Sequence, residues 1–477
     1  MMLSGKAAKL YTIFYECLLI VLSACILWYT YTSGTSFTYV MGEFPAPWGN
    51  EIRAGVLEAL IALTFLVVLL CSVLAGWKFL QLDIDDSKIN LYFTLLNLLT
   101  AALMAMTWTN DIFTGYVFLE ILTLTSCGIL IVREIGRTTL AAVRYMILNL
   151  LGSGLFLLGV VLLYDITGHL LMMNMQDTIA KIAAEKTGMP ALTLSVGILT
   201  IGLAIKSGLF PFHFWMPDTY GWATPTSASV LSALVSKAYI FLLIKIYIRV
   251  IGMDVLNEMP IGKILCVLGM CGIIFGSVSA MRANNINKMV AFSSAAQIGY
   301  IYMGIGIGGI AGYTAALFHI MTHAVTKSLL FLSTPRLAEV SDSSLLFKKL
   351  QGSALRDREA GFFFTIGSLS MIGIPIFAGF SSKLLFSLSA VSSGSDRKMI
   401  LIMLVLAVSS LLNAMYFIRT IIRIYSHPAL PAASAAHVRN GAEYILPSAV
   451  LTAANLFLGL FSWAVVGLIE NGLSMFG

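Results

Sequence analysis

Charged residues are scarce in this sequence of 477 residues. Asp, Glu, Lys and Arg make up only 11% of it, whereas hydrophobic residues make up 58% and the mean hydropathy is +0.91. Soluble globular domains carry about 25% charged residues, so the composition excludes that class. The net charge of +6 is modest. This charge does not indicate binding to nucleic acid, because basic loops that face anionic lipid account for it.

Cysteine is also rare, and no CxxC motif occurs. All six cysteines lie in apolar runs, which predicts small core residues rather than a disulfide framework or iron–sulfur ligands. No haem, flavin or dinucleotide motif is visible, so we expect no cofactor. The chain would then have no redox centre of its own, and whether it takes part in an enzyme depends on other chains. The six are Cys17, Cys25, Cys71, Cys127, Cys266 and Cys271.

Long apolar runs dominate what is present. About 20 apolar residues are needed for a helix to cross a bilayer, and runs of this length recur from end to end. They predict an all-α polytopic membrane protein with about 13 transmembrane helices. An amphipathic piece in the 165–190 loop predicts a short surface helix. The predicted spans are 9–32, 54–77, 89–109, 110–133, 138–165, 192–216, 224–251, 261–281, 285–307, 308–332, 358–391, 399–425 and 445–472.

The distribution of basic residues between the loops predicts the orientation. Most loop lysines and arginines fall on the side that holds the N-terminus, and only Arg53, Lys181, Lys186, Arg397 and Lys398 fall on the other. Cytoplasmic loops carry the excess of positive charge. We therefore expect a cytoplasmic N-terminus and, with an odd number of spans, a C-terminus outside.

Two predicted spans are interrupted. The sixth has Pro211 shortly after Lys206, and the eleventh has Pro375 before Lys383. Broken helices at matching places in two halves are typical of inverted-repeat transporters. We expect two inverted five-helix repeats, each with one broken helix. The predicted domains are N-terminal helices at 1–88, a first repeat at 89–251, a second at 261–425 and a last helix at 426–477.

Three charged residues inside apolar spans of the first half are candidate functional residues. They are Glu120, Lys206 and Lys237. An intramembrane ionisable residue is a functional-site hypothesis by default. A carboxylate beside a lysine predicts a proton site that can open and close, and a structural ion pair that fixes helix packing is the alternative. Lys245 is nearer a span end, so we expect it to reach the surface and play no part.

The second half carries three titratable residues on one helix face. His319, His323 and Lys327 follow at i, i+4 and i+8. Histidine passes protons near neutral pH, which favours a relay, although buried histidines in a purely structural role remain the alternative. No third ligand is near in sequence, so we expect no metal site. Lys383 would end the series.

Four residues near the breaks are secondary candidates for gating or for orienting water. They are Pro211, His213, Asp218 and Pro375. Asp218 is equally well interpreted as a cap of the next helix.

Several ordered motifs resemble one family. AIKSGLFPFHFWMPDTYGWATPTSASVLSALVSK resembles the central motif of the antiporter-like subunits shared by respiratory complex I, Mrp-type cation/proton antiporters and energy-converting membrane hydrogenases. TNDIFTGYVFLEI, RYMILNLLGSGLFLLGVVLLYDITGHL, HIMTHAVTKSLLFL and GIPIFAGFSSKLLF support it, in the family's order over residues 40 to 425. The likeness is greatest to the D-type subunit of Mrp and its hydrogenase counterpart.

The resemblance implies that Glu120 pairs with Lys206 and that Lys237 bridges the two halves. It places His319, His323 and Lys327 in a second half-channel that ends at Lys383. It also implies a multi-pass subunit in the cell membrane of a prokaryote, working with other membrane subunits to move protons, with or without Na⁺ in exchange. Two alternatives stay open, a structural subunit that conducts nothing and a stand-alone transporter of a small solute.

Overall fold

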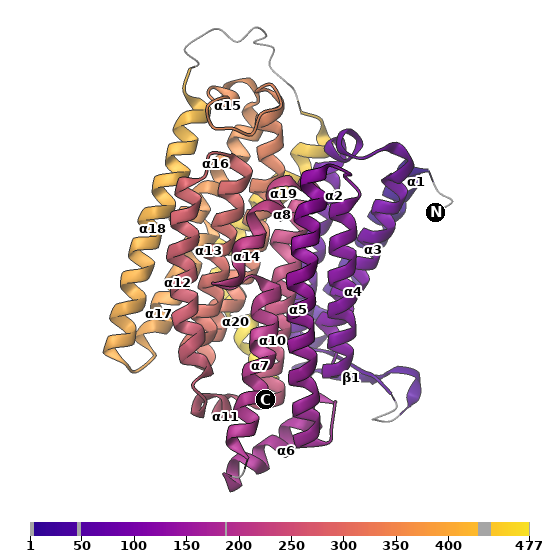
Figure 1. The fold of residues 1–477 in the computed structure, drawn as a ribbon, viewed down its shortest axis with the longest axis vertical. Helices are drawn as coiled ribbons and strands as arrows, with labels where there is room; N and C mark the ends of the chain where they lie inside the picture. Colours follow the sequence, from indigo (N-terminus) through magenta and orange to yellow (C-terminus); the bar gives the residue numbers. More distant parts are fainter. Residues whose placement is uncertain (1–3, 45–48, 187, 428–439, 477) are drawn as a thin grey trace.

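The computed structural model describes residues 4–44, 49–186, 188–427 and 440–476 of the chain. They form a tall bundle of helices with one small β-hairpin at one end (Figure 1). The upper end in Figure 1 is the one where the first helix begins, and the lower end is the one that holds the hairpin.

The first part of the chain forms the hairpin, five long helices and one surface helix. The hairpin pairs β1 (Phe37–Val40) with β2 (Glu51–Ala54) in antiparallel register, with a 3₁₀ turn η1 (Met41–Glu43) after β1. The helices are α1 (Gly5–Ser33), α2 (Val56–Asp83), α3 (Asp86–Trp108), α4 (Ile112–Ile131), α5 (Gly136–Thr167) and α6 (Met172–Glu185).

The middle of the chain is more broken. Its elements are α7 (Met189–Ser207), η2 (Phe212–Trp215), α8 (Met216–Trp222), α9 (Pro225–Val230), the π-helix η3 (Leu231–Val235), α10 (Ser236–Ile246), the π-helix η4 (Tyr247–Ile251) and α11 (Met253–Glu258).

The remaining helices are longer again, apart from one short turn. They are α12 (Ile261–Arg282), α13 (Ile286–Ile307), α14 (Gly309–Glu339), α15 (Ser353–Arg356), α16 (Arg358–Ile372), α17 (Ala378–Val391), α18 (Asp396–Tyr425), α19 (Ala442–Leu460) and α20 (Ser462–Ser474).

Membrane crossings agree with the predicted spans. In the described part of the chain, twelve helical segments are long and apolar enough to cross a membrane, and α16 with α17 forms one further, broken crossing. The helix α6 lies at the lower end as the predicted surface helix, with Met172, Met175 and Ile179 buried beneath it. The fold is therefore the expected polytopic bundle, with the hairpin as an addition.

The two halves run in opposite directions. The helix α3 descends towards the lower end, where Thr109 forms a β-bridge to Ile52 of the hairpin, whereas α12 rises from the lower end. Each half contains one broken helix, α7 with α8 and α16 with α17. These features give two inverted five-helix repeats around a common centre.

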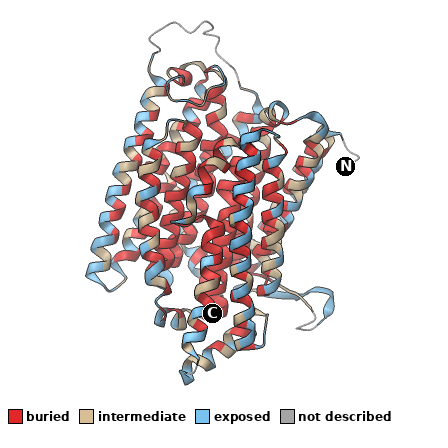
Figure 2. Ribbon diagram, in the orientation of Figure 1, coloured by how far each residue is buried: buried red, intermediate tan, exposed pale blue. Residues whose placement is uncertain are grey.

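Burial identifies that centre. The segments Pro225–Ile251 and Gly309–Glu339 are buried over their whole best apolar window, whereas α1 is buried over only 17% of its own (Figure 2). A helix buried all round must satisfy its polar groups within the protein, because lipid offers no partners. The polar side chains on α10 and α14 therefore lie in the interior of the bundle and have their partners there.

The cysteines only partly follow the prediction of core residues. Cys71, Cys127 and Cys266 are buried, but Cys17 and Cys25 are exposed on α1. This part of the prediction is wrong because most of α1 faces outward, where a small apolar side chain suits lipid as well as a core. All six thiols are free.

Candidate functional site

Lys206 lies in the last turn of α7, just before the first break. The helix ends because Gly208 adopts a left-handed conformation with a φ of +79°, and a Cβ there would lie 2.4 Å from Met216. The Lys206 side chain is fully buried, and its Nζ donates to Thr123 Oγ1 on α4 at 2.7 Å. The ammonium also lies 5.3 Å from the ring centroid of Tyr239.

Glu120 does not form the expected ion pair with Lys206. No described acidic oxygen lies within 4.0 Å of the Lys206 ammonium, which is held instead by Thr123, one turn along α4 from Glu120. The Glu120 side chain is half-buried, and its Oε1 is buried without a hydrogen-bond partner. The structure therefore shows the two side chains unpaired, with the Lys206 ammonium bound to the Thr123 hydroxyl.

Lys237 lies in the first turn of α10, just after the π-helix η3. Its Nζ donates to the carbonyl oxygen of Ser232 at 2.6 Å and to Ser236 Oγ at 3.1 Å. The wider turn of a π-helix shifts the backbone hydrogen bonds and leaves a carbonyl free to accept. The lysine is fully buried, and no ion pair neutralises it among the residues that the structure describes.

The face of α14 that carries His319, His323 and Lys327 is buried as predicted. His319 Nδ1 shares a hydrogen bond of 2.7 Å with Ser382 Oγ on α17, and its Nε2 has no partner. Both ring nitrogens of His323 are buried without partners, and the two imidazole centroids are 6.2 Å apart. Lys327 Nζ donates to the carbonyl oxygen of Val290 at 2.9 Å.

Two adjacent serines on α13 connect the lysines of the two halves. Ser294 Oγ lies 2.9 Å from Ser232 Oγ, beside the carbonyl that holds Lys237. Ser293 Oγ accepts a hydrogen bond from Lys327 Nζ. One turn of α13 therefore carries one hydroxyl beside the Lys237 environment and one on Lys327. The pair Ser293–Ser294 was not singled out in the sequence, where serines of this kind are common in helix contacts.

Lys383 lies beyond the second break and reaches back across it. Its Nζ donates to the carbonyl oxygen of Ile372 at 2.6 Å and to Ser410 Oγ on α18 at 3.0 Å. Ile372 is the last residue of α16, so its carbonyl has no partner within the helix. Gly373 follows with a φ of +93°, and a Cβ there would lie 2.9 Å from Lys383 Cδ. Pro375 lies in the same break.

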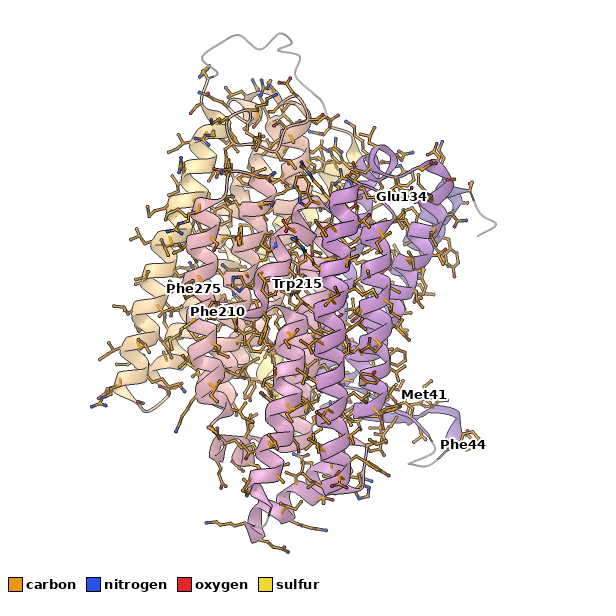
Figure 3. The ribbon with its side chains drawn as sticks, viewed as in Figure 1. Met41, Phe44, Glu134, Phe210, Trp215 and Phe275 are labelled. Atoms are coloured by element: carbon orange, nitrogen blue, oxygen red, sulfur yellow. The ribbon has the colours of Figure 1, made fainter. Side chains whose placement is uncertain are left out.

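The residues near the first break have separate surroundings. Pro211 precedes η2, and the His213 ring packs 5.6 Å from the ring of Phe210, with Nδ1 unpartnered. Phe210 also stacks on Phe275 of α12, at mid-height in the bundle (Figure 3). Asp218 forms ion pairs elsewhere, with Arg144 at 3.1 Å and Lys288 at 2.9 Å.

Asp218 is therefore not the predicted helix cap. The next helix, α9, is capped by the Thr224 side chain, which accepts from Ser227 N. Two cations nearby already bind the Asp218 carboxylate, so it is not available as a cap.

Lys245 corrects another prediction. It is fully buried and does not reach the surface, because its Nζ lies 3.5 Å from Glu58 Oε1 and donates to the carbonyl oxygen of Thr107 at 2.9 Å. Arg53 binds the same carboxylate oxygen at 2.7 Å. Arg249 Nε donates to Asn110 nearby at 3.2 Å. We name Arg53, Glu58, Lys245 and Arg249 the lower charge cluster.

Sequence reasoning missed Glu58 and treated Arg53 as a loop charge. The signal was present, since Glu58 stands in the first turn of an apolar run, but nothing in the sequence identifies its partners. Glu16 was missed in the same way. It is fully buried on α1, where Thr100 of α3 donates to one carboxyl oxygen at 3.0 Å and the other has no partner.

Comparison with known proteins identifies the family. Residues 109–412 match the family described as NADH:quinone oxidoreductase/Mrp antiporter, TM. The chain is 32% identical over 461 residues to NADH-quinone oxidoreductase subunit N of Desulforudis audaxviator, covering 92% of this chain and 87% of that protein. It is 25% identical over 410 residues to the D-type subunit of the Na(+)/H(+) antiporter of Bacillus subtilis, covering 86% and 79%.

Comparison of the fold with solved structures agrees with the sequence comparison. A chain of the Mrp complex from Dietzia sp. DQ12-45-1b superposes with a TM-score of 0.87 at 20% identity, covering 99% of this chain and 92% of that chain. The family match spans more than half of the sequence, and it lies over both broken helices and the buried lysines. The resemblance of the motifs is thereby confirmed, and the chain belongs to the NADH:quinone oxidoreductase/Mrp antiporter family of multi-pass membrane subunits.

Proposed function

We propose that the chain moves protons across the membrane as one subunit of a larger complex, along a path of buried titratable side chains. The path runs from Glu120 and Lys206 through Lys237 to the α14 face, and ends at Lys383. The proposal rests on the hydrogen-bond partners of the four lysines on this path, which are Lys206, Lys237, Lys327 and Lys383. Each is held by neutral hydroxyl or carbonyl oxygens, and none is held by a carboxylate.

Neutral partners suit a path better than ion pairs do. A buried ammonium without a counter-charge is easily deprotonated, because burial disfavours the charged form. Hydroxyl groups both donate and accept, so they can hold a lysine in either protonation state. The unpartnered nitrogens of His319 and His323 offer proton acceptors between Lys237 and Lys383.

Each repeat holds one end of this path, with Glu120 and Lys206 in the first repeat and Lys383 in the second. We propose the division predicted from the sequence, with a first repeat at 89–251 and a second at 261–425. Basic loops on the upper end support a cytoplasmic N-terminus, with the lower end outside. The subunits named among its relatives work in NADH-quinone oxidoreductases and Na(+)/H(+) antiporters, which supports further membrane subunits as partners. Either a redox reaction in another chain or a Na⁺ gradient would drive transport.

Substitution of Glu120 and Lys206 tests the proposal. Glu120→Gln and Lys206→Ala, each in the assembled complex in vesicles, should reduce proton movement followed with a pH-sensitive dye by on the order of a hundredfold, because each removes a proton-transfer site. Assembly should be unchanged, since no ion pair is broken. Glu185→Gln, on the exposed surface of α6, is the matched control.

Unchanged proton movement in both variants would rule out this path. Loss of the complex instead of loss of transport would support a structural subunit. Repeating the measurement with and without Na⁺ on the opposite side of the membrane distinguishes simple proton movement from exchange.

A further inference from the structure

A basic cavity of about 590 Å³ opens at the upper end, apart from the lysine path. It lies between the end of α12, the start of α13, residues 346–348 and the last turns of α18. Four of its lining side chains carry positive charge, and none of its lining residues is acidic. The four cations are Arg282, Lys348, Arg419 and Arg423.

These four charges are not neutralised by the protein. None of them takes part in an ion pair among the described residues, and the positions outside the described ranges contain no Asp or Glu. Asp342, on the same loop as Lys348, pairs with Lys349 instead. Arg423 lies over the Phe347 ring at 5.6 Å, which holds its guanidinium at the cavity wall. Like charges gathered in one cavity favour a bound anion.

A shallow apolar groove lies beside the basic cavity, against the outer face of α18. The groove has a volume of about 400 Å³ and is lined by Ala414, Met415, Ile418, Arg419 and Ile422 of α18. Arg419 belongs to both hollows. The rest of the groove wall is apolar and exposed, with Met415 50% and Ile422 61% exposed. The two hollows therefore occupy the same turns of α18 on adjoining faces, with positive charge on one side of Arg419 and apolar surface on the other.

We propose that the cavity and groove together bind one anionic phospholipid, with its phosphate among the four cations and an acyl chain along α18. A guanidinium group can bind two phosphate oxygens at once through two parallel hydrogen bonds, so the three arginines suit a phosphate ligand. Basic pockets between helices at the membrane surface are a known form of lipid headgroup site. The groove decides in favour of a lipid, because a free phosphate or an acidic protein segment would leave it unused.

Thermal unfolding of the delipidated full chain in detergent tests this site. Phosphatidylglycerol and cardiolipin should raise the unfolding temperature, and phosphatidylcholine should not. Arg282→Gln with Arg419→Gln should weaken phosphatidylglycerol binding on the order of tenfold, since each basic residue contributes to attraction of an anionic lipid. Arg358→Gln, an exposed arginine at the same end and outside the cavity, should leave binding unchanged.

Two further arms separate the sources of the anion. Inorganic phosphate and glycerol phosphate at equal concentration should not reproduce the shift, and Ile418→Asn in the groove should weaken lipid binding while all four cations remain. Equal stabilisation by phosphatidylcholine, or by inorganic phosphate alone, would overturn the proposal. So would loss of a neighbouring protein from the complex in the arginine double variant without any effect of lipid, because the cavity would then be a protein interface.

Discussion

Two groups of buried charges lie within the same first half of the chain and are held in opposite ways. In the lower charge cluster, Glu58 is bound by Arg53 and Lys245 through short contacts. Along the central path, Lys206 and Lys237 are held only by neutral oxygens, and Glu120 keeps an unpartnered oxygen. The first arrangement gives two of its cations a shared carboxylate, whereas the lysines of the second have no carboxylate partner among the described residues. Burial is common to both groups, so the proposed difference in role rests on the chemistry of their partners.

The largest expected effect is on the lower charge cluster. Glu58→Ala would leave two cations buried without a counter-charge, which costs about 3–5 kcal/mol of stability. The unfolding temperature of the purified chain measures it, and Glu58→Met combined with Lys245→Met should recover part of the loss. Glu443→Ala breaks the more exposed pair with Lys9 and should cost less than about 1 kcal/mol. A Glu58 variant as stable as the wild type would remove the distinction drawn between the two groups.

Lys237→Met tests the other member of the comparison. Proton movement by the assembled complex should fall on the order of a hundredfold, because a proton-transfer group is lost. The unfolding temperature should stay equal or rise, since no carboxylate loses a partner and methionine packs well in an apolar site. A stability loss as large as that of Glu58→Ala would place Lys237 among the structural charges.

Gly373→Ala tests how far the path depends on backbone shape at the second break. Its left-handed conformation disfavours a side chain, and the added Cβ would press on Lys383. A stability loss of about 1–3 kcal/mol is expected, together with slower transport. Gly394→Ala is the matched control, because its φ is +67° and it has open space around it. Equal effects of the two substitutions would show that backbone strain alone, and not contact with Lys383, is responsible.

Ser293→Ala should have the smallest of these effects. It removes the hydroxyl that receives Lys327, and a net hydrogen bond of about 1 kcal/mol corresponds to a few-fold slower transfer. Transport rates in vesicles provide the measurement. Ser328→Ala removes a buried hydroxyl that has no partner, next to Lys327 in the sequence, so transport should be unchanged there. A rate that responds to both serines alike would argue against a route through α13.

The spans and both breaks were predictable because apolar run length and Gly/Pro positions are local properties of a sequence. Lys245 shows where that reasoning ends. Its depth along the helix was clear, but its rotation towards Glu58 depends on how α2 packs against α10, which no local pattern records. The π-helix before Lys237 was missed for a similar reason, since small residues such as Ser232 are equally compatible with an ordinary helix.

The family resemblance identified the same candidate residues, and the structure adds how each is held. Glu120 and Lys206 were expected to touch, and they are separated because Thr123 takes the ammonium first. Asp218 was expected near the path and is bound by Arg144 and Lys288. Such outcomes depend on competition between nearby partners in three dimensions, which motifs do not describe.

The buried polar side chains of α1 have a consequence for insertion of the protein into the membrane. Thr12 and Glu16 face α3, where Asn97 donates to Thr12 and Thr100 to Glu16, while most of the helix is exposed on the outside of the bundle. An acidic residue at mid-depth costs about 3 kcal/mol when a helix enters the bilayer alone. During synthesis α1 emerges before α3 and meets this partner only after α3 has followed. Insertion of α1 should therefore depend on delayed pairing, and truncation before α3 should leave α1 poorly inserted.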